Sequence, residues 1–257
     1  MKICEKDNCF VENPDDANFC RRCGNRFNTN RHPAEPEMVF VQGGTFMMGA
    51  TPEQGDDCSD DEKPAHYVTV SDFYIGKYEV TQAQWQTVTG NNPSNFRGDN
   101  LPVEQVSWDD VQYFIRRLNA QTGKQYRLPT EAEWEFVARG GNSSRSYKYS
   151  GSNTVGNVAW YNENSGGITH PVGTKSPNEL GIYDMSGNVW ELCSDWFYSY
   201  SKNSQTNPQG PSSGSDRVVR GGGWNNIAKL VRALYRNAVA PSDRYCDFGF
   251  RLACSSK

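Results

Sequence analysis

The sequence has little of what membrane-spanning and nucleic-acid-binding proteins need. No apolar run approaches the roughly 20 residues required to cross a bilayer, and the first residues are charged, so no secretory signal is expected. Acidic residues outnumber basic ones by 30 to 26, which gives a net charge of −4 and no overall positive field. We therefore expect a cytoplasmic protein with no nucleic-acid partner and no membrane partner.

Residues for catalysis are also scarce. The three histidines, His32, His66 and His170, are widely spaced and form no metal-ligand pattern, so we expect them to be solvated or hydrogen-bonded. No nucleophile with a neighbouring base, no phosphate loop and no carboxylate pair is evident. The acidic run at residues 55–64 is typical of a solvated loop rather than a cation site.

The composition indicates one large domain with a small appendage. The chain has 257 residues, with 24 glycines, 7 tryptophans and 13 tyrosines, and a mean hydropathy of −0.78. Such a chain is expected to be rich in loops that aromatic side chains rigidify. Residues 28–37 contain two prolines and no apolar periodicity, which predicts a linker between residues 1–27 and residues 38–257.

The first 27 residues contain four of the eight cysteines. Their C-x4-C and C-x2-C pairs, the second followed by Gly24, can present four thiolates tetrahedrally to zinc. So short a segment cannot build an adequate core, and a metal would supply its folding energy. A disulfide-bonded knot is the alternative, which a reducing compartment disfavours. The segment resembles bacterial zinc ribbons, and we predict a structural zinc site at Cys4, Cys9, Cys20 and Cys23.

Helices and strands can be located in residues 38–140. Three helices are predicted to begin after the capping residues Thr81, Ser107 and Thr130. Residues 38–49 alternate apolar side chains around Gly43–Gly44, which predicts a β-hairpin. Residues 65–81 contain further strand candidates, and residues 140–257 contain short strands between loops.

Seven short motifs occur in order along residues 38–254: VQGGTFMMG, YEVTQAQW, PVEQVSWDDV, YRLPTEAEWEFVARGG, ELGIYDMSGNVWEL, RVVRGGGW and GFRLA. Together they closely resemble the formylglycine-generating-enzyme, or sulfatase-modifying factor, family. The resemblance implies an α+β fold of the C-type-lectin-like kind, with little regular secondary structure, preceded here by the zinc ribbon.

Enzymes of this family use two copper-binding cysteines. The resemblance places these positions at Asn226 and Val231, whose amide and isopropyl groups cannot hold Cu(I). No copper and no formylglycine chemistry are therefore expected. A second enzymatic branch uses iron and clustered histidines, which this sequence lacks.

Family members often bind calcium in loops that match residues 156–164 and 186–192 in part. Asn157 and Asn188 are therefore candidate calcium ligands, since hard cations accept amide oxygens. The alternative is that both asparagines bond to loop backbone.

The stretch from Arg220 to Leu252 also resembles the variable segment of proteins diversified by retroelements. In this pattern Trp224, Arg232, Arg236 and Gly249 belong to the scaffold. The ligand-binding positions would be Asn226, Ile227, Leu230, Leu234, Ala238, Val239, Ala240, Tyr245, Cys246 and Asp247.

Two functions remain open at this point. The first is a non-catalytic binding protein whose surface, formed by residues 224–248, recognises a ligand that we expect to be another protein. The second is a family member retained as a regulatory or metal-dependent redox enzyme of unknown substrate. If the apolar residues of the segment belong instead to the core, the ligand surface lies elsewhere.

Overall fold

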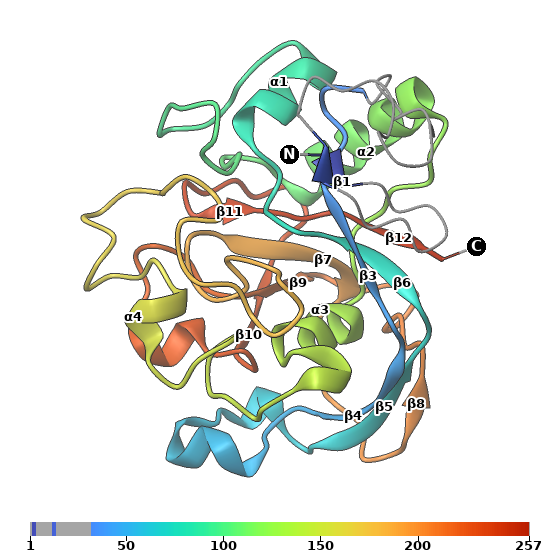
Figure 1. The fold of residues 1–257 in the computed structure, drawn as a ribbon. Coiled ribbons are helices and arrows are strands. Elements are labelled where there is room, and N and C mark those ends of the chain that lie inside the picture. The colour runs from blue at the N-terminus through green and yellow to red at the C-terminus, as the bar shows by residue number, and fades with distance from the viewer. Residues whose placement is uncertain (1, 4–11, 14–31, 257) are drawn as a thin grey trace.

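The computed structural model of the chain describes residues 2–3, 12–13 and 32–256 (Figure 1). Two short strands, β1 (Lys2–Ile3) and β2 (Glu12–Asn13), pair antiparallel. The predicted zinc ligands Cys4, Cys9, Cys20 and Cys23 lie outside the described residues, so the zinc ribbon stays a prediction.

A long, bent, two-stranded ribbon opens the large domain. Its strands are β3 (Met38–Val41), β4 (Gly44–Met48), β5 (His66–Val70) and β6 (Phe73–Gly76). Strand β3 pairs with β6, and β4 pairs with β5. The predicted hairpin at Gly43–Gly44 is therefore wrong, because these glycines bend one continuous strand. A Cβ atom at Gly43 would lie 2.3 Å from the carbonyl oxygen of Val70. The backbone at residue 43 can therefore approach the backbone of residues 70–72 this closely only if residue 43 is glycine.

Within residues 32–256 the strands form three sheets. Strand β6 lies between β3 and β12 (Ala253–Ser255), and β5 lies between β4 and β8 (Gln205–Thr206). The third sheet has the order β10–β9–β7–β11. Its strands are β7 (Trp190–Trp196), β9 (Arg217–Arg220), β10 (Arg236–Val239) and β11 (Phe248–Gly249). Most of the segment from Arg220 to Leu252 therefore lies in or beside this sheet.

The three predicted helices are confirmed. They are α1 (Gln82–Thr89), α2 (Trp108–Thr122) and α3 (Glu131–Ala138), each opened by a complete capping box at the predicted residue. Gly90 and Gly123 close the first two in the left-handed conformation. A short helix, α4 (Val155–Val158), and four 3₁₀ turns complete the helical structure described: η1 (Pro52–Asp57), η2 (Asp60–Glu62), η3 (Gly141–Ser143) and η4 (Ala228–Val231).

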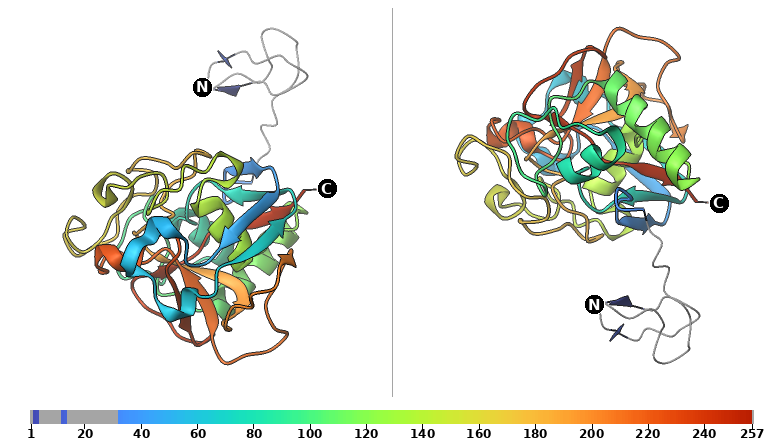
Figure 2. Two further views of the ribbon diagram at one scale, coloured as in Figure 1. Left: turned by 90° about the horizontal axis from the view of Figure 1, so that it is seen from below. Right: turned by 90° about the horizontal axis from the view of Figure 1, so that it is seen from above.

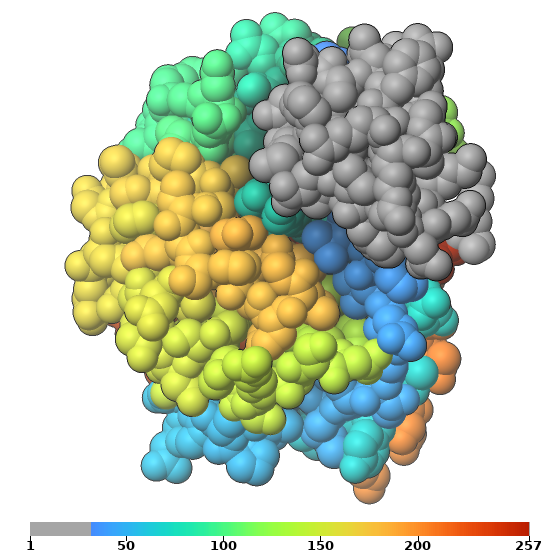
Figure 3. Space-filling model, viewed as in Figure 1, coloured from blue at the N-terminus to red at the C-terminus, as the bar shows by residue number. Residues whose placement is uncertain are grey.

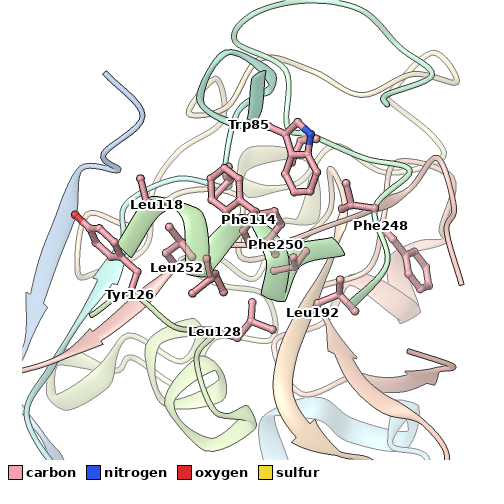
Figure 4. Packing of buried hydrophobic residues seen from close by; sticks show 14 of the residues in the cluster. Trp85, Phe114, Leu118, Tyr126, Leu128, Leu192, Phe248, Phe250 and Leu252 are labelled. Atoms are coloured by element: carbon pink, nitrogen blue, oxygen red, sulfur yellow. The ribbon is translucent and has the colours of Figure 1, made fainter. Parts of the chain in front are cut away.

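The largest buried cluster lies between α1, α2 and the sheet of β7 (Figure 4). The Trp85 ring stacks on Phe114 with centroids 5.1 Å apart, and both rings meet the edge of Phe250. Helices α1 and α2 pack side by side on one side of the domain, as the view from above shows (Figure 2). This cluster fixes Phe250 at the end of the candidate variable segment.

Candidate ligand-binding surface

Buried arginines fix the backbone of the segment from Arg220 to Leu252. Arg232 contacts Glu62 with Nη2 2.6 Å from Oε1, and Arg236 contacts Glu131 with Nε 2.7 Å from Oε1. Both arginine side chains are fully buried. Buried pairs of this kind hold a unique geometry, and removing one partner leaves an uncompensated charge.

Two more pairs lie at the ends of the segment. Arg220 contacts Glu135 of α3 and also donates to the carbonyl oxygens of Leu234 and Tyr235. Arg251 contacts Glu191 of β7, with Nε 2.6 Å from Oε2. The scaffold role expected of Arg232 and Arg236 therefore agrees with the structure and extends to Arg220 and Arg251.

Trp224 joins three parts of the chain. Its backbone N–H donates to the carbonyl oxygen of Asn188 at 2.8 Å, and its indole Nε1 donates to that of Cys246 at 3.1 Å. Its ring meets that of Phe96 edge to face, with centroids 5.4 Å apart. Trp224 thus holds the start of the segment against its end and against the loop that carries Phe96.

The ten predicted ligand-binding residues differ in exposure. Ile227 and Tyr245 are 54% and 48% exposed. Five are half-buried: Asn226, Leu230, Ala238, Ala240 and Cys246. Three are buried: Leu234, Val239 and Asp247.

For Leu234 and Val239 the expectation of surface exposure is wrong. Their exposed fractions are 1% and 6%, and Val239 packs in the cluster that contains Phe114. Strand β10 turns the Val239 side chain inward, on the same side of the sheet as the core. Asp247 is buried as well, and burial raises the pKa of its carboxyl group above its ordinary value.

The positions matched to the copper cysteines do not fit copper. Asn226 Oδ1 accepts from the backbone N–H of Gly223 at 2.8 Å, so its amide holds a local turn. Val231 is completely buried among Tyr149, Val158 and Tyr161, and η4 lies beside α4 (Figure 1). A backbone-bonded amide and a packed isopropyl group supply no soft donor for Cu(I).

The candidate calcium ligands lie in different surroundings. Asn188 is buried in the left-handed conformation, its amide donates to Glu79 Oε2 at 2.6 Å, and its Oδ1 accepts from the His170 N–H. Asn157 is exposed. Within the described ranges, no three His, Cys, Asp or Glu side chains are grouped to hold a metal. The calcium site stays a prediction. Asn188 could bind calcium only if its side-chain amide gave up its present hydrogen bonds.

Glu104 was not predicted from the sequence, although it lies next to the segment from Arg220 to Leu252. Its side chain is completely buried, Oε1 accepts from the backbone N–H of Phe96 at 2.8 Å, and Oε2 has no hydrogen-bond partner among the described residues. Burial raises the pKa of Glu104 from 4.5 to about 7. The one sequence signal was a glutamate in an apolar context, between Val103 and Val106.

Comparisons with known proteins agree with this architecture. The chain is 36% identical to the chaperone protein LppX of Paenibacillus barcinonensis, over 85% of this chain and 89% of that protein. It is 30% identical to the formylglycine-generating enzyme of Streptomyces coelicolor, over 84% of this chain and 88% of that enzyme. The solved structure of Treponema denticola variable protein 1 superposes with a TM-score of 0.77 at 33% identity, covering 85% of this chain and 95% of that one.

The expected α+β, C-type-lectin-like fold class is confirmed by this structural similarity. No helix in the described part of the chain is long and apolar enough to cross a membrane. The family model described as the sulfatase-modifying factor enzyme 1-like domain matches residues 25–256. The chain therefore belongs to the FGE-sulfatase family, the family that includes the formylglycine-generating enzymes, and carries asparagine and valine where the resemblance places the copper-binding cysteines.

Proposed function

We propose that this chain is a non-catalytic binding protein that recognises a protein ligand through exposed side chains of residues 224–248. Ile227 and Tyr245 would make the central apolar contacts, and the half-buried Asn226, Leu230 and Ala238 would complete the surface. Leu234 and Val239 are not part of this proposal, because they are buried in the domain.

One observation carries the proposal: fully buried and exposed large side chains occur within one short segment. Arg232 and Arg236 are buried in ion pairs that fix the backbone. Ile227 and Tyr245, from the same segment, leave about half of their surface in water. Large apolar and aromatic groups on a rigid support dominate the binding energy of protein interfaces. A backbone held in this way could tolerate changes at its exposed positions without loss of the fold.

The similarity to Treponema denticola variable protein 1 supports the same interpretation. The Arg220–Leu252 segment resembles the part of such proteins that retroelements diversify, and two of its scaffold residues, Arg232 and Arg236, are buried. LppX is named a chaperone protein, which supports a protein as the kind of ligand. We further propose that zinc folds residues 1–27, that calcium binds near Asn157 or Asn188, and that the protein is cytoplasmic.

Site-specific photocrosslinking tests the binding surface. A benzoylphenylalanine residue is placed at Ile227 or Tyr245 and, as a control, at Tyr113 of α2, which is 46% exposed and distant in sequence from the segment. Irradiation of producing cells should give one discrete protein adduct from positions 227 and 245 and none from position 113. The same adducts from all three positions, or no adduct from 227 and 245, would contradict the proposal.

A further inference from the structure

A hollow of about 460 Å³ lies beside the variable segment, and most of its lining comes from another part of the chain. Five lining residues belong to the stretch 93–105, and one belongs to the segment: Pro93, Ser94, Asn95, Arg97, Gln105 and Arg244. On the face drawn in Figure 3, the green stretch near residue 95 borders the gold loop near residue 165. The Ser165 hydroxyl of that loop donates to the carbonyl oxygen of Trp224.

Hydrogen bonds hold the floor of the hollow in place. The backbone N–H of Gln105 donates to the carbonyl oxygen of Tyr245 at 3.0 Å, so the hollow adjoins an exposed residue of the segment. The backbone N–H of Glu104 donates to Ser94 Oγ at 3.1 Å, and the Glu104 carboxyl accepts from Phe96. The Phe96 ring then packs on Trp224. The stretch 93–97 is therefore tied to both ends of the segment and forms a preorganised rim.

The charges around the hollow favour a ligand group with a single negative charge. Arg97 is exposed, donates from Nη1 to the carbonyl oxygen of Asn92 at 2.6 Å, and makes no ion pair with any described residue. The Arg244 guanidinium is already bound to both carboxylate oxygens of Asp110, at 2.6 and 2.9 Å. Burial raises the pKa of the Glu104 carboxyl and the charge of Arg97 lowers it in part, but Arg97 makes no ion pair with that group. The remaining Arg97 donors are thus available to a ligand, and a guanidinium group matches a carboxylate.

A doubly charged group would fit less well. Asp110 lies behind Arg244, and Asp243 and Asp247 flank Tyr245, whose hydroxyl contacts Asp243 at 3.3 Å. These acidic groups would repel a phosphate dianion more than a carboxylate monoanion. The side-chain amides of Asn95 and Gln105 add neutral donors for the same ligand group.

We propose that this hollow is a second part of the binding surface, in which Arg97 receives an aspartate or glutamate side chain of the protein ligand beside the apolar contacts of Tyr245. The inference rests on the proposed binding function and names one chemical feature of its ligand. It also extends the surface to residues 93–97, outside the segment that resembles a variable region.

Nuclear magnetic resonance can test the hollow without the natural ligand. The ¹⁵N-labelled full chain is titrated with N-acetyl-aspartate N-methylamide, with the corresponding asparagine compound and with inorganic phosphate. The aspartate compound should cause saturable shifts at Asn95 and at the Arg97 side chain, and the other two should bind at least ten-fold more weakly. Arg97→Met should weaken aspartate binding at least ten-fold. Arg116→Met, which removes an exposed arginine of α2, should leave it unchanged.

Several results would overturn the inference: no saturable shift, equal binding of the asparagine compound or of phosphate, or unchanged binding to Arg97→Met. The same titration of Ile227→Ser should still show the aspartate shifts, since Ile227 does not line the hollow. Failure of the hollow is therefore distinguishable from failure of the binding surface, which the photocrosslinks at positions 227 and 245 report.

Discussion

Replacing Arg232 with methionine removes one half of a buried ion pair and leaves Glu62 without its partner. The Arg232 guanidinium contacts both Glu62 oxygens, at 2.6 and 3.2 Å, the Gln54 side chain at 3.1 Å and the carbonyl oxygen of Lys229 at 2.8 Å. Both charged side chains are fully buried. Breaking such a pair costs about 3–5 kcal/mol, which lowers the Tm of a domain of this size by about 6–20 °C.

Ile227→Ser is the matched change on the exposed side of the same segment. Ile227 is 54% exposed, and truncating a surface group usually changes the free energy of unfolding by about 1 kcal/mol or less. Leu234→Ser should resemble the arginine variant instead, because its side chain is 1% exposed and core truncations cost about 2–5 kcal/mol. The loss of unfolding free energy should therefore depend on how deeply each side chain is buried and not on its position in the sequence.

Two measurements on the full chain report these differences: urea unfolding monitored by tryptophan fluorescence, and thermal unfolding monitored by calorimetry. A double variant, Arg232→Met/Glu62→Met, should lose less stability than the sum of the two single variants, because it leaves no unpaired buried charge. The reasoning would be refuted if Arg232→Met stayed within about 1 kcal/mol of the parent, or if Ile227→Ser were destabilised as much as Leu234→Ser.

Three further predictions concern metal, chemistry and pH. The chain should carry one zinc ion, and chelation should unfold residues 1–27 but leave the Tm of the large domain unchanged; metal analysis without zinc in reducing buffer would contradict this. Copper-loaded protein should not convert the cysteine of a sulfatase-type peptide to formylglycine, since Asn226 and Val231 are not thiols; aldehyde above background in a mass spectrum would overturn that expectation. The folded-state pKa of Glu104 is about 7, above its ordinary 4.5, so folding favours the protonated group. Its contribution to stability is full below pH 4.5 and is lost as the pH rises through about 7. Urea midpoints of the parent should therefore fall relative to Glu104→Gln over this range, and parallel curves would show that Glu104 does not titrate there.

Local signals were enough to predict the helices. Thr81, Ser107 and Thr130 each open a helix with a complete capping box, because side-chain and backbone partners three residues apart can be identified from sequence alone. The Gly43–Gly44 pair misled for the same reason. A glycine pair between apolar strands favours a hairpin locally. Here, however, β3 and β4 pair with β6 and β5 and not with each other, and the backbone of residues 70–72 packs against Gly43.

The candidate binding surface was predictable only in outline. The resemblance separated Arg232 and Arg236, which are buried, from Ile227 and Tyr245, which are exposed. It could not reveal that Leu234 and Val239 are buried, since their exposure depends on the strands and helices packed against β10. The acidic partners were also hidden, because Glu62 and Glu131 lie 170 and 105 residues away from the arginines they contact. Glu104 and Arg97 likewise could not be singled out from the sequence, because their surroundings depend on tertiary contacts of residues 93–105.

The most direct test of the binding account measures affinity and stability on the same variants. Once photocrosslinking has identified the ligand, isothermal titration calorimetry compares the parent, Ile227→Ser, Tyr245→Ser and the control Tyr113→Ser, each with its Tm. The account predicts that the changes at Ile227 and Tyr245 weaken binding by about ten-fold or more, that Tyr113→Ser does not, and that the Tm of all three stays close to that of the parent. Unchanged affinity in both segment variants, with their folds intact, would contradict the claim that this segment binds the ligand.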